Sequence, residues 1–352
     1  MSLTHEAYMQ RCIDLARRGA GYVAPNPMVG AVLVYDGRII GEGYHTKYGE
    51  AHAEVNCLAS VSGEDRQHIS SSRMYVSLEP CAHYGKTPPC ADLIIAHHIP
   101  EVIIGCRDSY REVDGKGIAR LQAAGVNVVY GVMEKECRQL NRRFFCFQEQ
   151  HRPYVILKWA QTNDGKIAGG TQERLLISNE YTNRLVHRWR SEEAAILVGT
   201  NTALLDNPSL TTRLWPGPSP RRMVVDMDLR LPADLHLMDG AADTIVFNRH
   251  RHGVSSSSSL MYYQLTEDVS FVPQFLHALY QLKILSVLVE GGARLLQSFI
   301  DENAWDEARV ITNTVLVAGN GLPAPQLSSA FAKDQYRLGV DEVIIYEPSA
   351  NR

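Results

Sequence analysis

The chain has 352 residues, of which 45% are hydrophobic and 21% charged, a composition that indicates a folded globular protein and excludes a fibrous or disordered one. A formal net charge of −4 excludes the chain-wide basic field that holds nucleic acids by their phosphates, so we expect no nucleic-acid partner. No apolar run approaches about 18 residues, so we expect no signal peptide and no membrane partner, and we predict a cytoplasmic protein.

The cysteines and the length indicate two domains. All seven cysteines lie within the first 150 residues, and an odd number confined to one half predicts metal ligands or buried thiols instead of a disulfide framework. Two domains of about 100–200 residues fit this length. The charged, proline-containing stretch "QEQHRPY" lies between two patterned halves. We therefore predict one domain over 1–148 and a second over 149–352.

The first half alternates helical and extended patterns. The predicted elements are a helix over 5–18, a hairpin turning at Asp36-Gly37, helices over 52–60, 90–98 and 117–124, strands over 73–79, 101–106 and 126–131, and polar helical sequence over 134–150. Such alternation predicts a three-layer α/β sandwich.

The second half alternates in the same way and predicts a second α/β domain. Its predicted strands are 154–161, 194–199, 222–226, 243–248 and 284–290, with two more near 306–312 and 340–346, and its predicted helices are 179–191, 273–282 and 292–301. The biased stretch "RHRHGVSSSSSL" predicts a solvated loop.

Two short motifs in the first half indicate a metal centre. His52 and Glu54 lie two residues apart at a predicted helix start, and Cys81 and Cys90 each follow a proline. One histidine and two cysteines give three ligands and leave a position open for water, as in catalytic zinc; a closed structural site normally has four ligands. In hydrolytic base deamination a zinc site activates water and a glutamate moves the proton to the departing amine. The alternatives are a structural zinc site or satisfied core thiols.

The loop between the two cysteines is longer than the two residues of many base deaminases. With "APNPMVGAVLV" and "AHAEVNCL", the stretch "SLEPCAHYGKTPPCADLI" resembles the deaminase half of RibD, the bifunctional riboflavin biosynthesis family. The resemblance covers nearly all of residues 5–145. It implies a cytidine-deaminase-like α/β/α fold, one Zn²⁺ per chain on His52, Cys81 and Cys90, and Glu54 as general acid and base.

Four further residues near these motifs are candidate substrate contacts. Asn26 stands between two prolines, and its amide could pair with a pyrimidine edge or belong to a plain turn. His45, His83 and Lys86 lie close to the motifs in sequence and could meet a substrate phosphate. The alternative for these three is a solvated loop residue.

The second half lacks a G-x-G-x-x-G motif but has two strand-glycine-helix turns. One runs through Glu290 into Gly291-Gly292, and the other runs through Gly199 into Thr200-Asn201-Thr202. Glycine lets a phosphate approach the backbone, and a helix N-terminus supplies free N–H groups. Each turn could hold phosphate, and each could be a tight turn without a ligand.

Three stretches of this half resemble the reductase half of the same family, which has a dihydrofolate-reductase-like fold. They are "RPYVILKWAQTNDGKIAG", "LVHRWRSEEAAILVGTNTALLDNPSLTTR" and "VLVEGGARLLQSF". The resemblance covers about residues 152–315 and implies NADPH as cofactor. The implied NADPH contacts are Thr202, Asp206, Gly292, Ala293, Arg294, Leu295, Leu296, Gln297 and Ser298, and the implied substrate contacts are Arg190, Leu210, Arg213 and Glu290.

The chemistry of some of these side chains agrees with the implied contacts. Arg190 and Arg213 could clamp a sugar phosphate, or each could form an ordinary surface ion pair. Lys158 is a further candidate polar contact. Hydride transfer needs mainly orientation of the nicotinamide, so no single acid or base is required. The stretches "QTNDGK" and "RLLISN" depart from the usual pattern of the family.

Together the resemblances imply a two-step enzyme that acts on a small phosphoribosyl pyrimidine. The first step is zinc-dependent deamination of 2,5-diamino-6-(5-phosphoribosylamino)pyrimidin-4(3H)-one. The second is NADPH-dependent reduction of the ribosyl group of 5-amino-6-(5-phosphoribosylamino)uracil to ribityl. They also imply a homodimer or higher homo-oligomer. The alternatives are an active deaminase with a weak or inactive reductase, a tRNA or nucleoside deaminase with an unrelated partner domain, and a regulatory pair of binding domains.

Overall fold

The structure is a computed structural model that describes residues 4–84, 88–110, 113–170, 175–254 and 259–349. The chain divides into two compact units, residues 1–151 and residues 152–352. We call them the N-terminal unit and the C-terminal unit. Among the helices in the described parts of the chain, none has the length and apolarity needed to cross a membrane.

The N-terminal unit is built on a five-stranded sheet in the order β2-β1-β3-β4-β5. The strands are β1 (Gly30–Tyr35), β2 (Arg38–Tyr44), β3 (Arg73–Leu78), β4 (Glu101–Cys106) and β5 (Asn127–Tyr130). β1 runs antiparallel to both β2 and β3, whereas β3, β4 and β5 are parallel. The carboxyl ends of β3 and β4 therefore open on the same edge, where ligands bind in open α/β sheets.

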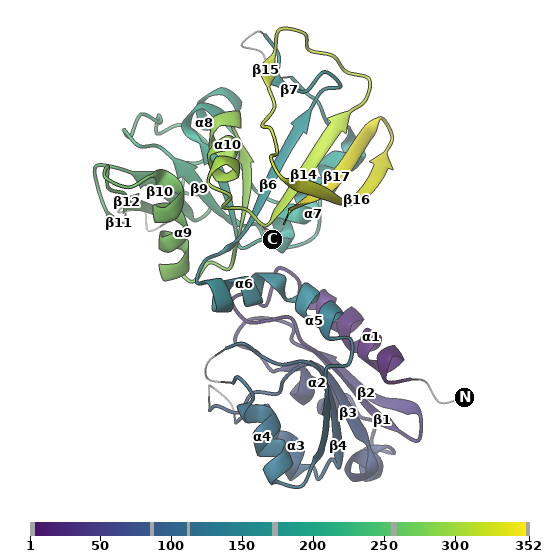
Figure 1. The fold of residues 1–352 in the computed structure, drawn as a ribbon. Helices are drawn as coiled ribbons and strands as arrows, with labels where there is room; N and C mark the ends of the chain where they lie inside the picture. Colours follow the sequence, from purple (N-terminus) through teal and green to yellow (C-terminus); the bar gives the residue numbers. More distant parts are fainter. Residues whose placement is uncertain (1–3, 85–87, 111–112, 171–174, 255–258, 350–352) are drawn as a thin grey trace. The chain divides into compact units, whose positions relative to one another are not determined.

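Helices cover both faces of this sheet (Figure 1). They are α1 (His5–Ala16), α2 (Ala53–Ala59), α3 (Cys90–Ala96), α4 (Lys116–Ala123), α5 (Glu134–Leu140) and α6 (Arg142–Gln150), with short 3₁₀ helices at Arg17–Gly19 and Arg66–Ser71. On one face, Cys57 of α2, Ile94 of α3 and Leu121 of α4 share a core with the strands. On the other face α1 lies so close to β1 that a side chain at Gly30 would collide with the Cys12 carbonyl. The predicted three layers are confirmed.

The C-terminal unit has a ten-stranded sheet in the order β11-β12-β10-β9-β8-β13-β6-β14-β17-β16 and a two-stranded sheet of β15 and β7. The strands are β6 (Tyr154–Gln161), β7 (Lys166–Ala168), β8 (Ala195–Gly199), β9 (Arg221–Val225), β10 (Thr244–Asn248), β11 (Gly253–Val254), β12 (Leu260–Gln264), β13 (Ser286–Gly291), β14 (Glu307–Asn313), β15 (Leu322–Pro323), β16 (Ala330–Leu338) and β17 (Asp341–Pro348). From β12 to β14 all neighbouring strands are parallel.

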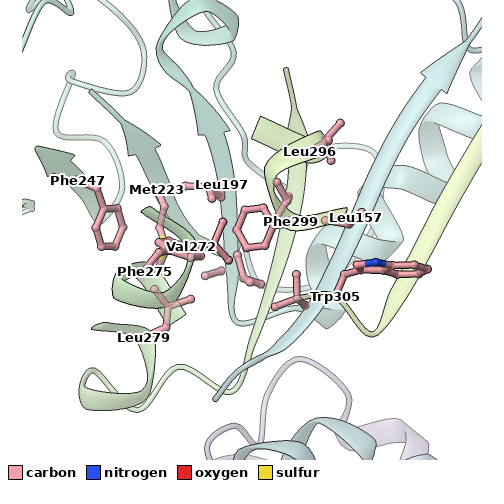
Figure 2. Packing of buried hydrophobic residues seen from close by; sticks show 14 of the residues in the cluster. Leu157, Leu197, Met223, Phe247, Val272, Phe275, Leu279, Leu296, Phe299 and Trp305 are labelled. Carbon is pink, nitrogen blue, oxygen red and sulfur yellow. The ribbon is translucent and has the colours of Figure 1, made fainter. Parts of the chain in front are cut away.

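Buried apolar side chains hold the helices of this unit to the sheet. The helices are α7 (Glu180–Glu192), α8 (Thr200–Asp206), α9 (Phe271–Gln281) and α10 (Ala293–Asp301). Phe275 of α9 and Phe299 of α10 meet edge to face, with ring centroids 5.9 Å apart, over Leu197 and Met223 of the parallel strands (Figure 2). Parallel sheets bury both faces, so their strands read as the continuous apolar runs seen here.

The structure contains the long elements predicted from the sequence and adds short ones. Residues Leu260–Gln264 form β12, which pairs in parallel with β10. Residues Gly253–Val254 form β11, which pairs antiparallel with β12. The predicted loop over 249–260 is confirmed for residues 249–252 but was wrong for Gly253–Val254 and Leu260, which belong to strands because backbone pairing overrides local composition; residues 255–258 lie outside the described chain. The edge strand β16 was missed because most of its residues are exposed and polar.

Candidate active sites

Three predicted metal ligands come together in the N-terminal unit. His52 precedes α2, Cys81 follows the end of β3, and Cys90 is the first residue of α3. The Nδ1 atom of His52 lies 3.6 Å from Sγ of Cys81 and 3.4 Å from Sγ of Cys90. All three ligand atoms lie within 4.8 Å of one another. Loops that leave neighbouring strands and helices thus deliver one nitrogen and two sulfur atoms to a single point.

The spacing of these atoms fits tetrahedral zinc. With Zn–S near 2.3 Å and Zn–N near 2.0 Å, tetrahedral geometry places nitrogen and sulfur about 3.5 Å apart. The observed separations of 3.4 and 3.6 Å agree with that value. A hydrogen bond from Cys90 holds the pKa of the Cys81 thiol below its ordinary value, which favours the thiolate form that zinc binds.

Glu54 lies in the first turn of α2, beside the ligands. It is only 3% exposed, and burial raises the pKa of its carboxyl group above the ordinary value. A carboxyl group with a raised pKa holds a proton more readily than an exposed one, as a group that accepts a proton and then passes it on requires. The position and the burial of Glu54 therefore suit a proton carrier at this centre.

A second histidine fixes Asn26 at the same site. Nδ2 of Asn26 lies 3.2 Å from Nε2 of His45, and Nδ1 of His45 lies 3.0 Å from the carbonyl of Ala51. A carbonyl only accepts, so the His45 hydrogen is on Nδ1 and its Nε2 accepts from the Asn26 amide. Burial lowers the pKa of His45, which favours this neutral form.

The two remaining candidates of this half lie on the loop between the cysteines. His83 is exposed and meets the ring of Tyr110 edge to face at 6.0 Å. Lys86 lies outside the described residues.

Glu79 is a buried residue at this site that sequence reasoning missed. Its carboxylate accepts hydrogen bonds from four backbone N–H groups, those of Asp108 at 3.3 Å, Gly115 at 3.0 Å, Gly117 at 2.9 Å and Ile118 at 3.2 Å. It thereby ties the loop that carries Cys81 to the start of α4. The available signal was an acidic residue that directly follows the apolar strand of "YVSLEPC".

Replacing this carboxylate tests its structural role. Glu79→Ala leaves four N–H groups without their acceptor, so we expect the N-terminal unit to lose about 2–4 kcal/mol of stability. Denaturant titration of purified variants measures the loss. The control is Glu64→Ala, because Glu64 is exposed and should change stability by less than about 0.5 kcal/mol. Equal effects of the two variants would contradict the role of Glu79.

The C-terminal unit contains a cavity of about 1340 Å³ at the carboxyl ends of its parallel strands. Most of the predicted contacts line it. They are Lys158, Arg190, Thr202, Asp206, Leu210, Arg213, Glu290, Gly292, Ala293, Arg294, Leu295 and Leu296. Gln297 and Ser298 are not among the lining residues: Gln297 accepts from the N–H of Gln326, and Ser298 donates to the Leu295 carbonyl.

The two strand-glycine-helix turns face each other in this cavity. A Cβ atom at Gly292 would lie 3.2 Å from Oγ1 of Thr202, and one at Gly291 would lie 3.6 Å from it. Gly291 also has a φ of 137°, which side chains with a Cβ rarely adopt. Two helix N-termini, those of α8 and α10, thus converge where a phosphate could reach the backbone of both.

Three charged residues that line the cavity form a cluster of ion pairs. Arg190 binds Glu290 through two parallel hydrogen bonds of 2.8 and 2.7 Å, and Nζ of Lys158 lies 3.9 Å from the same carboxylate. Burial alone would raise the pKa of Glu290, but the charges of Arg190 and Lys158 outweigh burial and lower it to about 2. The third nitrogen of Arg190 donates to the Thr211 carbonyl at 3.4 Å, so all three of its guanidinium nitrogens bind groups of the protein.

Arg213 differs from Arg190 in its surroundings. Its side chain is exposed and one of its nitrogens lies 3.0 Å from the hydroxyl of Thr211. Its backbone N–H donates to Nδ1 of His187. Burial, together with the nearby charges of Arg190 and Arg213, lowers the pKa of His187 to about 4, so this ring is a neutral acceptor at pH 7.

The Glu290 carboxylate predicts a pH dependence of stability. Its pKa is lowered from 4.5 to about 2 on folding, so its contribution is full above pH 4.5 and is lost as the pH falls toward 2. The contribution is about 3 kcal/mol. We expect the stability difference between the wild type and Glu290→Gln to shrink between pH 6 and pH 3, measured by denaturant titration.

A matched variant separates this effect from general acid denaturation. Glu192 pairs with Arg188 on the exposed side of α7. The difference between the wild type and Glu192→Gln should stay within about 0.5 kcal/mol over the same pH range. A wild type to Glu290→Gln difference that does not change with pH would contradict the lowered pKa.

Each of the two units matches the profile of a known protein family. The profile of the RibD C-terminal domain matches residues 153–333, and that of the cytidine and deoxycytidylate deaminase zinc-binding region matches residues 2–106. The chain is 36% identical over 351 residues to the riboflavin biosynthesis protein RibD of Aquifex aeolicus, covering 97% of each chain. It is 39% identical over 326 residues to that of Bacillus amyloliquefaciens, covering 91% of this chain and 87% of the relative.

Solved structures of RibD proteins also match this chain over nearly its whole length. A diaminohydroxyphosphoribosylaminopyrimidine deaminase/5-amino-6-(5-phosphoribosylamino)uracil reductase from Thermotoga maritima superposes with a TM-score of 0.89 at 34% identity, covering 98% of each chain. The RibD of Acinetobacter baumannii superposes with a TM-score of 0.89 at 29% identity, covering 98% of this chain and 99% of that chain.

Proposed function

Because the chain belongs to the RibD family of riboflavin biosynthesis enzymes, we propose that it carries out two successive steps on one phosphoribosyl pyrimidine. It is a bifunctional enzyme with a zinc-dependent deaminase domain and an NADPH-dependent reductase domain. The proposed substrates are 2,5-diamino-6-(5-phosphoribosylamino)pyrimidin-4(3H)-one for the first step and 5-amino-6-(5-phosphoribosylamino)uracil for the second. The proposed domains are residues 1–148 and 149–352.

The deaminase proposal rests on the three ligand atoms at tetrahedral spacing beside a buried glutamate. His52, Cys81 and Cys90 would hold the zinc, which when bound supplies a Lewis acid that makes water nucleophilic at neutral pH. Glu54 takes a proton from the attacking water and delivers it to the amino group that leaves as ammonia.

Other residues of the deaminase domain orient the substrate. Asn26 pairs with the pyrimidine edge through the amide that His45 holds in place. Since both ring nitrogens of His45 are engaged within the protein, we assign it to positioning Asn26 and not to the phosphate. His83 and Lys86 are the proposed phosphate contacts.

In the reductase half, NADPH supplies the hydride, and the chain provides binding and orientation. Thr202, Asp206 and the turn from Gly292 to Leu296 hold the cofactor phosphates and ribose. Arg213 binds the substrate phosphate, because Arg190 is occupied by Glu290. The charged Glu290 carboxylate, flanked by Lys158, accepts a hydrogen bond from a hydroxyl group of the ribose chain, and Leu210, which lines the same cavity, contacts the substrate.

Ammonia release distinguishes this proposal from a nucleoside deaminase. We expect zinc-loaded protein to release ammonia from the diaminopyrimidine ribosyl phosphate and to leave cytidine and adenosine unchanged. A faster release from either nucleoside would overturn the substrate assignment and support the nucleoside deaminase.

A weak reductase remains a second candidate for the C-terminal unit. No residue of the departure "QTNDGK" is among the described lining residues of the cavity, but Leu175, Leu176, Ile177 and Ser178 of the departure "RLLISN" are. NADPH consumption with the deaminated intermediate decides between the two. Turnover within the usual range of about 1–10³ s⁻¹ supports an active reductase, and turnover far below it supports the weak one.

Assembly and location remain proposals as well. We propose a homodimer or higher homo-oligomer in the cytoplasm, on the strength of the family and of the composition. Sedimentation at several protein concentrations tests the assembly state, and a single monomer species throughout would contradict it.

A further inference from the structure

One buried asparagine joins the junction of two helices to the loop before β1. Asn141 lies between α5 and α6 and is 2% exposed. Its Oδ1 accepts the backbone N–H of Met28 at 2.8 Å, and its Nδ2 donates to the Met28 carbonyl at 2.8 Å. Because an N–H faces one end of the amide and a carbonyl faces the other, only this orientation satisfies both. Asn141 thus binds both polar backbone groups of one loop residue.

A single proline separates Met28 from Asn26. Pro27 has a fixed φ and restricts the residue before it, so the link between Asn26 and Met28 has little freedom. The backbone N–H of Asn26 donates to the Val23 carbonyl at 2.9 Å, and its side-chain amide lies 3.2 Å from Nε2 of His45. A displacement of Met28 would therefore reach the Asn26 amide.

Beyond Met28 the chain is held by the start of the sheet. The N–H of His45 donates to the Val29 carbonyl at 2.9 Å, and the N–H of Gly30 donates to the hydroxyl of Ser77 at 3.1 Å. Met28 lies nearer to Asn26 along the chain than Val29 or Gly30. Asn141 therefore supplies the backbone anchor next to Asn26 on this side of the loop.

We propose that Asn141 is a positioning residue of the deaminase, which holds Met28 so that the Asn26 amide faces the pyrimidine edge of the substrate. The inference rests on the proposed function of the N-terminal unit, in which Asn26 recognises the pyrimidine. Asn141 acts through Asn26, because both ends of its own amide are used on Met28. His45 and Asn141 thus fix the same residue, the first through its side chain and the second through its backbone.

A double-mutant cycle on ammonia release tests this role. It compares wild type, Asn26→Ala, Asn141→Ala and the double variant, all loaded with zinc. We expect Asn141→Ala to raise KM about 5- to 10-fold, the value of about one hydrogen bond, with kcat nearly unchanged. In the Asn26→Ala background the same change should have no further effect. If Asn141→Ala does not fold, Asn141→Asp, which keeps the size of the side chain, replaces it in the cycle.

The opposite result identifies a purely structural role. A less stable fold reduces the amount of active enzyme, which lowers kcat and leaves KM unchanged. A fall in kcat alone, or an equal effect of Asn141→Ala with and without the Asn26 amide, overturns the proposal.

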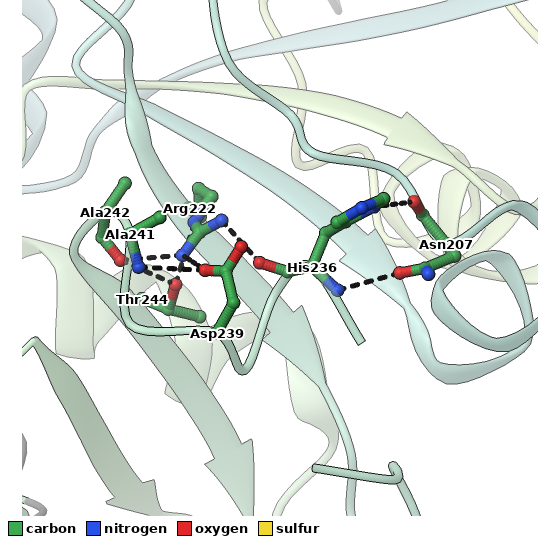
Figure 3. Close-up of polar contacts among 7 residues, drawn as sticks. All are labelled: Asn207, Arg222, His236, Asp239, Ala241, Ala242 and Thr244. Carbon is green, nitrogen blue, oxygen red and sulfur yellow. Dashed lines mark hydrogen bonds and ion pairs between the residues drawn. The ribbon is translucent and has the colours of Figure 1, made fainter. Parts of the chain in front are cut away.

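Two variants control for the loss of a contact of this kind elsewhere. In the C-terminal unit Oδ1 of Asn207 accepts the N–H of His236 at 2.8 Å, beside Arg222, which donates to the carbonyls of His236 and Ala242 at 2.6 and 2.8 Å (Figure 3). In the N-terminal unit the buried hydroxyl of Ser72, before β3, donates to the His68 carbonyl at 2.7 Å. Asn207→Ala and Ser72→Ala should leave KM for deamination unchanged.

A spectroscopic measurement separates this inference from the proposed function. The side-chain amide resonances of Asn26 in a ¹⁵N spectrum, assigned by their loss in Asn26→Ala, should shift in Asn141→Ala and stay in place in Ser72→Ala. A wild type that releases no ammonia from the diaminopyrimidine ribosyl phosphate refutes the proposed function, and the Asn26 resonances then decide alone on Asn141. Resonances that do not move in Asn141→Ala overturn its role.

Discussion

Glu54→Gln is expected to retain zinc and to lose deaminase activity by about 10²–10⁴-fold, the usual contribution of a positioned general acid and base. The amide has the size and hydrogen-bonding outline of the carboxyl group but cannot carry a proton between water and the leaving amine. Burial of Glu54 and its raised pKa suit that transfer in the wild type. Ammonia release under saturating substrate measures the loss, and metal analysis measures the zinc.

Two further measurements make this result specific. Reduction of the deaminated intermediate by NADPH should be unchanged in Glu54→Gln, because that step belongs to the other unit. Glu50→Gln, a change of an exposed carboxylate on the loop before His52, should deaminate at the wild-type rate. Turnover of Glu54→Gln within a few fold of the wild type would remove Glu54 from the proposed mechanism.

Cys81→Ser is expected to lose both the metal and the deaminase activity, with a fall in turnover of roughly 10³-fold or more, because the Lewis acid is gone. Serine offers a hydroxyl of high pKa in place of the thiolate that the site favours at this position. Zinc content after dialysis against a weak chelator should fall from about one ion per chain to near zero.

A second cysteine variant provides the comparison. The thiol of Cys12 donates to the Tyr75 carbonyl, a bond that a serine hydroxyl can also make, so Cys12→Ser should keep its zinc. If Cys81→Ser held zinc at full occupancy, Cys81 would not be a ligand and the three-ligand assignment would fail.

Sequence patterns were sufficient for the elements with strong periodicity and for the chemistry of the metal centre. The motifs around His52, Cys81 and Cys90 predict three ligands and an open position, and the structure brings these three ligand atoms within 4.8 Å of one another. The two glycine turns were likewise visible as strand-glycine-helix patterns, and they converge in one cavity.

Other contacts could not be predicted, because they join a side chain to backbone groups of a segment distant in sequence. The carboxylates of Glu79 and Asp226 and the guanidinium of Arg222 bind mainly backbone groups of segments brought near by the fold. Any residue type can supply a backbone N–H or carbonyl, so no motif announces such a contact. The sequence left Arg190 as either a phosphate clamp or a member of an ion pair, and it could not identify the partner, because Glu290 lies 100 residues away.

The central claim is that one chain carries out both steps, and mass spectrometry of the diaminopyrimidine ribosyl phosphate tests it most directly. The substrate is incubated with zinc-loaded protein, with and without NADPH. We expect a gain of about 1 Da without NADPH, from an amine replaced by oxygen, and about 2 Da more with it, from an added hydride and proton. A substrate whose mass is unchanged under both conditions would show that the chain carries out neither step.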